Sequence, residues 1–161
     1  RSHNLQVIIA RFFNTVGPKQ TGRYGMVIPR FVGQALRGED VTVYGDGTQS
    51  RTFTHVDEAT DAIMALIDSE RSIGEVVNIG GREEVSIYDL AKRIIAKTKS
   101  RSDVKLIPYA DAYPKEFEDM QRRVPSQEKL RELIGFAPEK VLDEILSDII
   151  DFFKKQRDQS F

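Results

Sequence analysis

The stretch V-T-V-Y-G-D-G-T-Q-S-R-T-F-T-H-V-D, residues Val41–Asp57, decides how the rest of the chain is interpreted. Two β-prone runs, Val41–Tyr44 and Thr48–Thr54, flank the tight-turn signal Gly45-Asp46-Gly47. This pattern predicts a β-hairpin, and a rigid hairpin is a suitable support for side chains that bind a ligand.

Two side chains of this stretch suggest the chemistry of that ligand. Arg51 lies in the second run with no acidic neighbour in sequence, and Tyr44 ends the first run. A guanidinium group binds phosphate oxygens through two parallel N–H groups, and the face of a tyrosine ring can cover a base. The pair therefore favours a ligand with both a phosphate and a flat ring. The alternative is that Arg51 is an ordinary surface arginine on an edge hairpin.

Composition limits the classes of function. The 161 residues suffice for one compact domain, and the formal net charge of −1 gives no basic footprint for nucleic acid or for a membrane surface. No apolar run is long enough to span a bilayer and no signal peptide opens the sequence, and the absence of cysteine suits a cytoplasmic protein. The sequence lacks cysteine and has only His3 and His55, which offers little for a metal site or a Ser-His-Asp triad.

Short apolar runs alternate with amphipathic segments along the chain, which predicts an α/β domain. Leu5–Ala10 is expected to form a buried strand, and its position almost at the first residue suggests that residue 1 is not a natural start. Further strands are expected at Glu75–Ile79 and Val104–Ile107. Helices are expected from Pro29 to Gly38, after the N-caps Asp57, Ser86 and Ser126, and from Val141 to Phe153; Tyr109–Gln121 is expected to be irregular.

Several separated motifs occur together in this chain. They are R-F-F-N-T-V-G-P at Arg11–Pro18, the stretch Val41–Asp57, N-I-G-G at Asn78–Gly81, the pair Arg122-Arg123, and L-R-E-L-I-G-F-A-P at Leu130–Pro138. In this order they resemble the extended short-chain dehydrogenase/reductase family, which includes NAD-dependent nucleotide-sugar epimerases, 4,6-dehydratases and UDP-glucuronate decarboxylases. The resemblance covers essentially the whole chain.

The resemblance implies that residues 1–161 form one segment, the C-terminal part of an extended Rossmann-type enzyme. This part would contain the last sheet strands and a small α/β substrate lobe. The family carries its glycine-rich dinucleotide loop and its catalytic Tyr-x-x-x-Lys upstream of the R-F-F-N motif, and this sequence holds no G-x-x-G-x-x-G. NAD would therefore be bound mainly by an N-terminal half that this sequence lacks. We expect no catalytic residue here, an inactive isolated chain, and an intact enzyme that is a homodimer.

One match to Tyr-x-x-x-Lys does occur, at Tyr88 and Lys92, but it falls after the N-I-G-G motif. At that place in the family fold it would begin an amphipathic helix that faces solvent. We therefore interpret Tyr88 and Lys92 as a pair on a helix surface.

The resemblance assigns roles to individual residues. Asn14 would hydrogen-bond the sugar or the diphosphate, and Arg51 would clamp the diphosphate, with Arg122 or Arg123 as a second arginine. The remaining assignments are the backbone amide of Val27 to the diphosphate at a helix start, Thr42 and Tyr44 to the base pocket, Asp119 to the ribose, and Phe12 to the nicotinamide of NAD. Two alternatives stay open: Asn14 as a cap on the turn into Gly17-Pro18, and Phe12 as a core residue.

The chain departs from the family pattern near Asp119. Several epimerases carry an arginine three residues before this acid, where this chain has Glu116, and the usual R-P-D is replaced by Arg123-Val124-Pro125-Ser126. Arg51 is for this reason the stronger assignment of the arginines.

In the intact enzyme, as the resemblance implies, NAD takes hydride from C4 of the sugar to give a 4-keto intermediate. The interpretation favoured here is a UDP-glucose 4-epimerase-like enzyme that binds a UDP-sugar. The alternatives are a UDP-glucuronate decarboxylase or a dTDP-glucose 4,6-dehydratase-like enzyme. An alternative of another class is a non-catalytic nucleotide-binding module.

Overall fold

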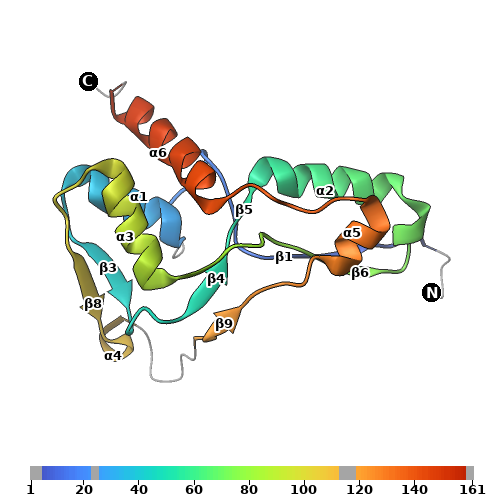
Figure 1. Cartoon of the computed structure of the whole chain (residues 1–161), viewed down its shortest axis with the longest axis horizontal. Coiled ribbons are helices and arrows are strands. Elements are labelled where there is room, and N and C mark those ends of the chain that lie inside the picture. The colour runs from blue at the N-terminus through green and yellow to red at the C-terminus, as the bar shows by residue number, and fades with distance from the viewer. Residues whose placement is uncertain (1–4, 23–25, 113–118, 159–161) are drawn as a thin grey trace.

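The computed structural model describes residues 5–22, 26–112 and 119–158, which form a mixed α/β fold with two parts side by side (Figure 1). Each part has its own hydrophobic core. We call them the helical part, which holds α1, α3 and α6, and the strand part, which holds β1, β6, α2 and α5. The middle strands β4 and β5 run between them.

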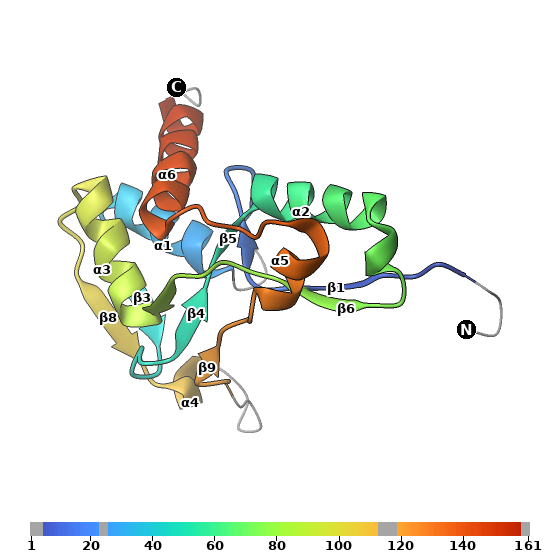
Figure 2. The same ribbon diagram turned by 45° about the vertical axis from the view of Figure 1, so that its right-hand side comes forward.

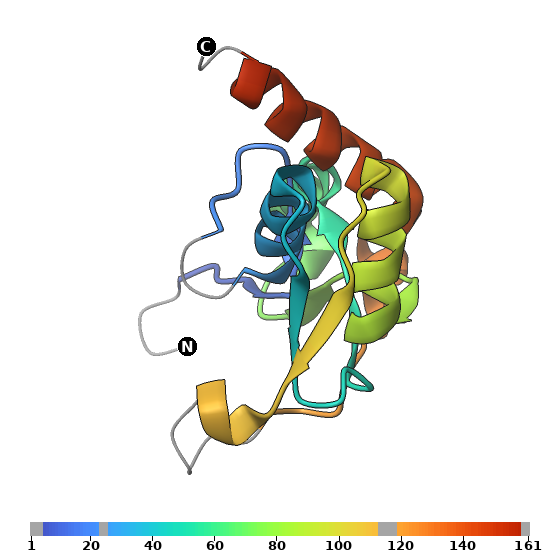
Figure 3. The same ribbon diagram turned by 90° about the vertical axis from the view of Figure 1, so that its left-hand side faces the viewer.

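The helical part packs its helices around a short parallel pair of strands. Strand β3 runs parallel to β8, from Val41 opposite Val104 to Tyr44 opposite Ile107. Helix α6 lies against both α1 and α3 (Figure 3). The bounds are α1 (Val27–Arg37), β3 (Val41–Tyr44), β7 (Glu84–Ser86), α3 (Ile87–Thr98), β8 (Val104–Ile107), α4 (Tyr109–Ala112) and α6 (Leu142–Asp158). The core of this part is built from fully buried Phe31, Val32, Leu90, Ile94, Ile145 and Ile149, among others.

Local sequence explains where helix α1 ends and where helix α3 begins. Helix α1 ends at Gly38, whose φ of 70° is the left-handed conformation that glycine adopts without strain. Helix α3 begins after Ser86, whose hydroxyl accepts a hydrogen bond from the Asp89 backbone N–H at 3.0 Å. Both ends were predicted from the sequence.

In the strand part, helix α2 lies above the strand pair β1 and β6 in the view of Figure 2. Strand β1 runs parallel to β6, and helices α2 and α5 pack on this pair through buried Ala62, Leu66, Ile79 and Leu130. The bounds are β1 (Ile9–Phe12), α2 (Val56–Asp68), the 3-10 turn η2 (Glu70–Ser72), β6 (Val76–Ile79) and α5 (Glu128–Ile134).

Two small sheets join the parts. Strand β4 (Ser50–Thr52) lies between β7, which is antiparallel to it, and β9 (Arg122–Arg123), which is parallel. Strand β2 (Thr15–Val16) runs parallel to β5 (Thr54–His55). The segment from Ser50 to His55 therefore contributes to both sheets and fixes the position of Arg51.

The predicted hairpin is wrong. The Gly45-Asp46-Gly47 turn forms, and the Asp46 carboxylate accepts hydrogen bonds from the backbone N–H and the hydroxyl of Thr48 at 2.9 and 2.8 Å. These bonds hold the pKa of Asp46 below its usual range. The strands on either side diverge, however, because β3 pairs with β8 and β4 pairs with β7 and β9. Partners far away in sequence therefore replace the local pairing.

The other corrections concern strand and helix boundaries. The first strand is Ile9–Phe12 instead of Leu5–Ala10, and it is not buried, since Ile9 is 52% exposed. Helix α2 is capped by His55, whose ring nitrogen Nδ1 accepts from the Asp57 N–H at 3.2 Å, so Asp57 lies inside the first turn. Helix α5 begins one residue after its expected first position, although Ser126 still accepts from the Glu128 N–H. Part of the segment expected to be irregular forms the short helix α4.

The described ranges contain neither a membrane-spanning helix nor a candidate metal site. No helix within residues 5–22, 26–112 and 119–158 is long and apolar enough to cross a membrane. In the same ranges no group of three or more His, Asp or Glu side chains is placed to hold a metal ion.

Candidate functional site

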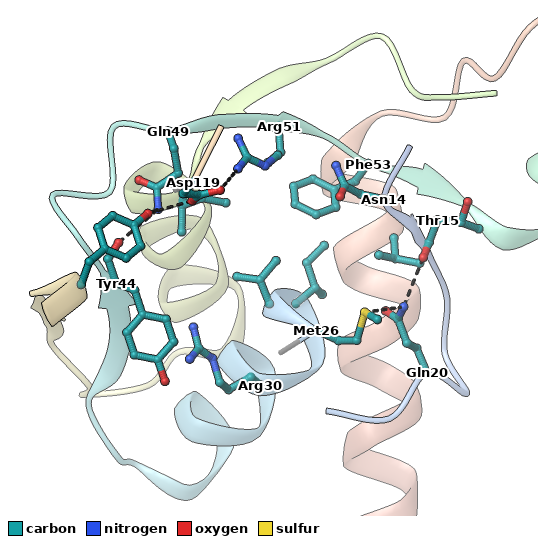
Figure 4. A pocket seen from close by; sticks show the side chains of 15 residues that line it. Asn14, Thr15, Gln20, Met26, Arg30, Tyr44, Gln49, Arg51, Phe53 and Asp119 are labelled. Atoms are coloured by element: carbon teal, nitrogen blue, oxygen red, sulfur yellow. Dashed lines mark hydrogen bonds and ion pairs between the residues drawn. The ribbon is translucent and has the colours of Figure 1, made fainter. Parts of the chain in front are cut away.

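A pocket of about 220 Å³ opens where the N-terminus of α1, the end of β3 and strand β4 meet (Figure 4). Five of the sequence-predicted residues line it: Asn14, Val27, Tyr44, Arg51 and Asp119. The other lining residues are Thr15, Val16, Gln20, Met26, Ile28, Arg30, Gln49, Phe53, Ile87 and Tyr109. The pocket thus brings together residues that are widely separated along the chain, from Asn14 to Asp119.

Arg51 lies on the central strand of its sheet, and its side chain is only 13% exposed. Its Nη2 donates to Oδ1 of Asp119 at 2.6 Å, and its Nη1 donates to the Ser50 carbonyl at 2.7 Å. Arg51 is therefore not the exposed arginine of an edge hairpin. No sequence pattern indicates this acidic partner, because Asp119 is 68 positions away.

Asp119 is held by a second donor from the short helix α4. The Tyr109 hydroxyl donates to Oδ2 of Asp119 at 2.7 Å, so each carboxylate oxygen has a partner. Buried Gln49 extends the chain of hydrogen bonds, because its amide donates to the Tyr109 hydroxyl at 2.9 Å and to the Tyr44 carbonyl at 3.1 Å. Neither Gln49 nor Tyr109 was a predicted site residue, and neither occurs in a sequence pattern that indicates this network.

The turn Gly45-Asp46-Gly47 leaves room for the Tyr109 ring of this network. Gly45 has a φ of 71°, and a Cβ atom on it would lie 2.3 Å from the ring of Tyr109. Any larger residue at Gly45 would therefore be strained in its backbone and would also displace the Tyr109 ring. The turn that seemed to signal a hairpin instead allows a tyrosine from α4 to reach Asp119.

Arg30, in the first turn of α1, is the second arginine of the pocket and was not predicted. Its Nη2 donates to the Thr42 carbonyl at 3.1 Å, and its guanidinium carbon lies 4.3 Å from the centre of the Tyr44 ring. Its Nε is buried and has no hydrogen-bond partner in the described structure. The sequence signal was weak, because an arginine between Pro29 and Phe31 resembles any polar residue of an amphipathic helix.

Asn14 and Val27 reach the pocket from opposite sides. Asn14 has a left-handed backbone (φ 31°), and its side-chain amide donates to the Thr52 carbonyl at 2.8 Å. The side-chain amide of Asn14 thus connects the start of β2 to β4, and it does not cap the turn at Gly17. Val27 is the first residue of α1, a helix with no acidic residue in its first turn and no side-chain cap. The free N–H groups at such an end attract anions.

The remaining predicted residues lie outside the pocket. Thr42 faces α1, where its hydroxyl accepts from Gln34 at 2.9 Å. Phe12 is 43% exposed at the end of β1 and is therefore not a core residue. Glu116 falls outside the described residues. Tyr88 and Lys92 lie together on α3, with the Lys92 ammonium 4.5 Å from the centre of the Tyr88 ring, as a helix-surface pair would.

The two arginines of strand β9 point to opposite faces of the sheet. Ser50 lies opposite Arg122 and Arg51 lies opposite Arg123 in the parallel register, and side chains opposite each other point to the same face. Arg122 is on the outer face, where it forms an ion pair with Glu84 at 2.9 Å. Hydrogen bonds from Arg122 and Ser50 keep the pKa of Glu84 below its ordinary value. Arg123 shares the face of Arg51 and lies over the Phe13 ring.

Comparison with known proteins gives one family. The NAD dependent epimerase/dehydratase family is matched over residues 1–80. The UDP-N-acetyl-alpha-D-glucosaminuronate decarboxylase of Bacillus cytotoxicus is 41% identical over 94% of this chain and 47% of its own length. The chain thus spans about half the length of this relative.

Solved structures of related enzymes have the same fold. The UDP-glucose 4-epimerase of Thermotoga maritima, solved with UDP-glucose, has a TM-score of 0.83 at 27% identity, over 95% of this chain and 47% of its own. The UDP-glucuronic acid 4-epimerase of Bacillus cereus, solved with UDP-glucuronic acid and NAD, has a TM-score of 0.81 at 27% identity, over 94% and 46%. The expectation of a partial Rossmann-type enzyme is confirmed by this coverage.

Proposed function

Because this chain belongs to the NAD-dependent epimerase/dehydratase family, we propose that its pocket binds the nucleoside diphosphate part of a UDP-sugar. The observation that carries the proposal is the charge of the pocket. Among the described residues that line it are two guanidinium groups, Arg30 and Arg51, and one carboxylate, Asp119. A ligand with two phosphates would balance this excess of positive charge.

The geometry supports a specific arrangement of the diphosphate. Arg51 is fixed on a central strand by two hydrogen bonds, so its remaining N–H groups are oriented before a ligand arrives. The N–H groups of Val27 and Ile28 have no acceptor within the helix and add positive potential, while Pro29 has no N–H and the Arg30 N–H donates to the Met26 carbonyl at 3.3 Å. The diphosphate would lie between these two groups of donors. Arg123 would be a further arginine that contacts it, because Arg123 shares the face of Arg51.

The other parts of the ligand follow from this placement. Asp119 would accept from the ribose hydroxyls, since each carboxylate oxygen can accept more than the one hydrogen bond that it has now. Asn14 would contact the sugar. The base would lie at the end of the pocket where β3 places Tyr44.

We also propose that the described residues contribute little to the binding of NAD. Phe12 alone is assigned to the nicotinamide, and it is exposed at the end of a two-stranded sheet. The sequence has no glycine-rich dinucleotide loop. We therefore propose that the cofactor named by the family is held by other parts of the enzyme, and that this chain alone is inactive.

For the reaction of the whole enzyme we propose epimerisation at C4 of a UDP-sugar, which the similarity to two 4-epimerase structures supports. Decarboxylation of a UDP-uronate is the second candidate. It is favoured by the higher identity to the Bacillus cytotoxicus decarboxylase, 41% against 27% for the 4-epimerases.

The first experiment is the thermal unfolding of the chain with UDP, dTDP, GDP and NAD in separate samples. A ligand that binds only the folded state raises the unfolding temperature. We expect a rise with UDP and no rise with NAD. A rise with none of the three nucleotides would contradict the proposed binding. Incubation of the chain with NAD and UDP-sugars should give no product, and product formation would contradict its assignment as a non-catalytic part.

A further inference from the structure

One face of the Tyr44 ring is covered by Arg30. The guanidinium carbon lies 4.3 Å from the ring centre, which is within the range of a cation–π contact. Figure 4 shows the Arg30 head beside the Tyr44 ring, on the side toward the other labelled residues of the pocket. A base that enters the pocket from that side meets the guanidinium before it meets the tyrosine face.

The position of the guanidinium is fixed. Nη2 donates to the Thr42 carbonyl, and Thr42 is two residues before Tyr44 on the same strand. The hydrogen bond and the ring contact together hold the guanidinium group beside β3. In this position the group has the Tyr44 ring on one side, and both residues line the pocket.

The two arginines of the pocket differ in their ion pairs. Within residues 5–22, 26–112 and 119–158, no carboxylate lies within 4.0 Å of the Arg30 guanidinium. Arg51, in contrast, has Asp119 at 2.6 Å. Among these residues no carboxylate offsets the charge of Arg30, and a flat guanidinium group can stack on an aromatic ring system as well as on tyrosine.

We propose that the guanidinium of Arg30 is the flat surface on which the base of a bound nucleotide stacks, with Tyr44 behind it as support. This inference rests on the proposed function and replaces the expected direct contact between the Tyr44 face and the base. The stack would be base, guanidinium, tyrosine. Stacking of this kind accepts any flat base, so Arg30 would add affinity for a nucleotide without selecting uracil.

The test separates the base from the phosphates. The dissociation constants of UDP and of inorganic pyrophosphate are measured by calorimetry for the chain and for three variants. Arg30→Lys keeps the charge and removes the flat group. Arg30→Ala removes both. Arg37→Ala is the control, because Arg37 is in the last turn of the same helix and pairs with exposed Glu39.

We expect the preference for UDP over pyrophosphate to fall about tenfold in Arg30→Lys, as for the loss of one stacking contact. Pyrophosphate binding should stay nearly constant in Arg30→Lys and weaken in Arg30→Ala, and Arg37→Ala should resemble the wild type in both. If Arg30→Lys does not fold, as judged by thermal unfolding, Arg30→Gln is used, and a fall in the same preference is expected.

Each other outcome has a definite meaning. An unchanged preference in a folded Arg30 variant would overturn the inference while leaving the proposed function intact. Equal affinity of the wild type for UDP and pyrophosphate would have the same meaning, because the base would then contribute nothing. A wild-type chain that binds neither ligand would overturn the proposed function and this inference together.

Discussion

On one wall of the pocket Arg51, Asp119 and Tyr109 satisfy one another, whereas on the opposite wall Thr15 Oγ1, Gln20 Oε1 and Arg30 Nε are buried without a hydrogen-bond partner in the described structure. Figure 4 shows the two walls facing each other, with Arg51 and Asp119 on one and Arg30, Met26 and Gln20 on the other. We call them the paired wall and the unpaired wall.

The difference between the walls shows two ways of preparing a site. The paired wall is rigid, but part of its positive charge is cancelled before a ligand arrives. The unpaired wall keeps its charge and leaves polar atoms unsatisfied, which costs free energy that a ligand or water could recover. A nucleotide would therefore be positioned by the paired wall and would gain new interactions mainly from the unpaired wall. Three substitutions on the paired wall and next to it test this comparison.

The largest effect is expected from Arg51→Ala. It removes the oriented guanidinium and leaves Asp119, which is 26% exposed, with a negative charge in the pocket. Affinity for UDP should fall by about 2–4 kcal/mol, the cost of losing a largely desolvated arginine that contacts phosphate. Calorimetric titration with UDP measures this loss of affinity. Arg51→Lys, which keeps the charge but not the planar guanidinium group, should lose less affinity. Unchanged affinity for UDP would mean that the paired wall does not bind the diphosphate.

An intermediate effect is expected from Arg123→Ala, with Arg122→Ala as its matched neighbour. Arg123 shares the face of Arg51 but is exposed, so its loss should weaken UDP binding by about 1 kcal/mol. Arg122 points to the other face and pairs with Glu84, so its loss should leave UDP affinity unchanged. The same titration compares the two variants. A larger effect for Arg122 than for Arg123 would contradict the assignment from strand register.

The smallest effect is expected from Asp119→Asn, where the direction of the change in pyrophosphate affinity is the informative result. Removing the carboxylate charge frees Arg51, so pyrophosphate should bind about threefold more tightly, which is under 1 kcal/mol. UDP should gain less than pyrophosphate, because the variant also loses an acceptor for the ribose. If pyrophosphate binds more weakly to Asp119→Asn, Asp119 does not compete with phosphate for Arg51, and its role is then to hold Arg51 in position.

Elements with strong local signals were predictable from the sequence. Helix α1 has a glycine at its end and apolar residues at helical spacing, and α3 has a serine N-cap with an acidic residue three positions later. The hairpin failed because the pairing of a strand depends on its neighbours in space. Val41 pairs with Val104, and no local pattern encodes a partner at that distance.

The candidate site was likewise predictable only in part from the sequence. Arg51 and Tyr44 were predicted from their residue types and positions, and Asn14, Val27 and Asp119 through family motifs; all five line the pocket. The contacts that define their chemistry were not accessible from the sequence. They depend on Arg30, Gln49 and Tyr109, whose roles arise only when β3, β4 and α4 are brought together.

The wide separation of these partners along the chain has a consequence for folding kinetics. Arg51 and Asp119 are 68 positions apart, and Gln49 and Tyr109 are 60 positions apart. Contacts that close such long loops are entropically costly and form slowly. The pocket should therefore be among the last features to assemble. A bound nucleotide would then slow the unfolding rate of the chain and leave its refolding rate nearly unchanged.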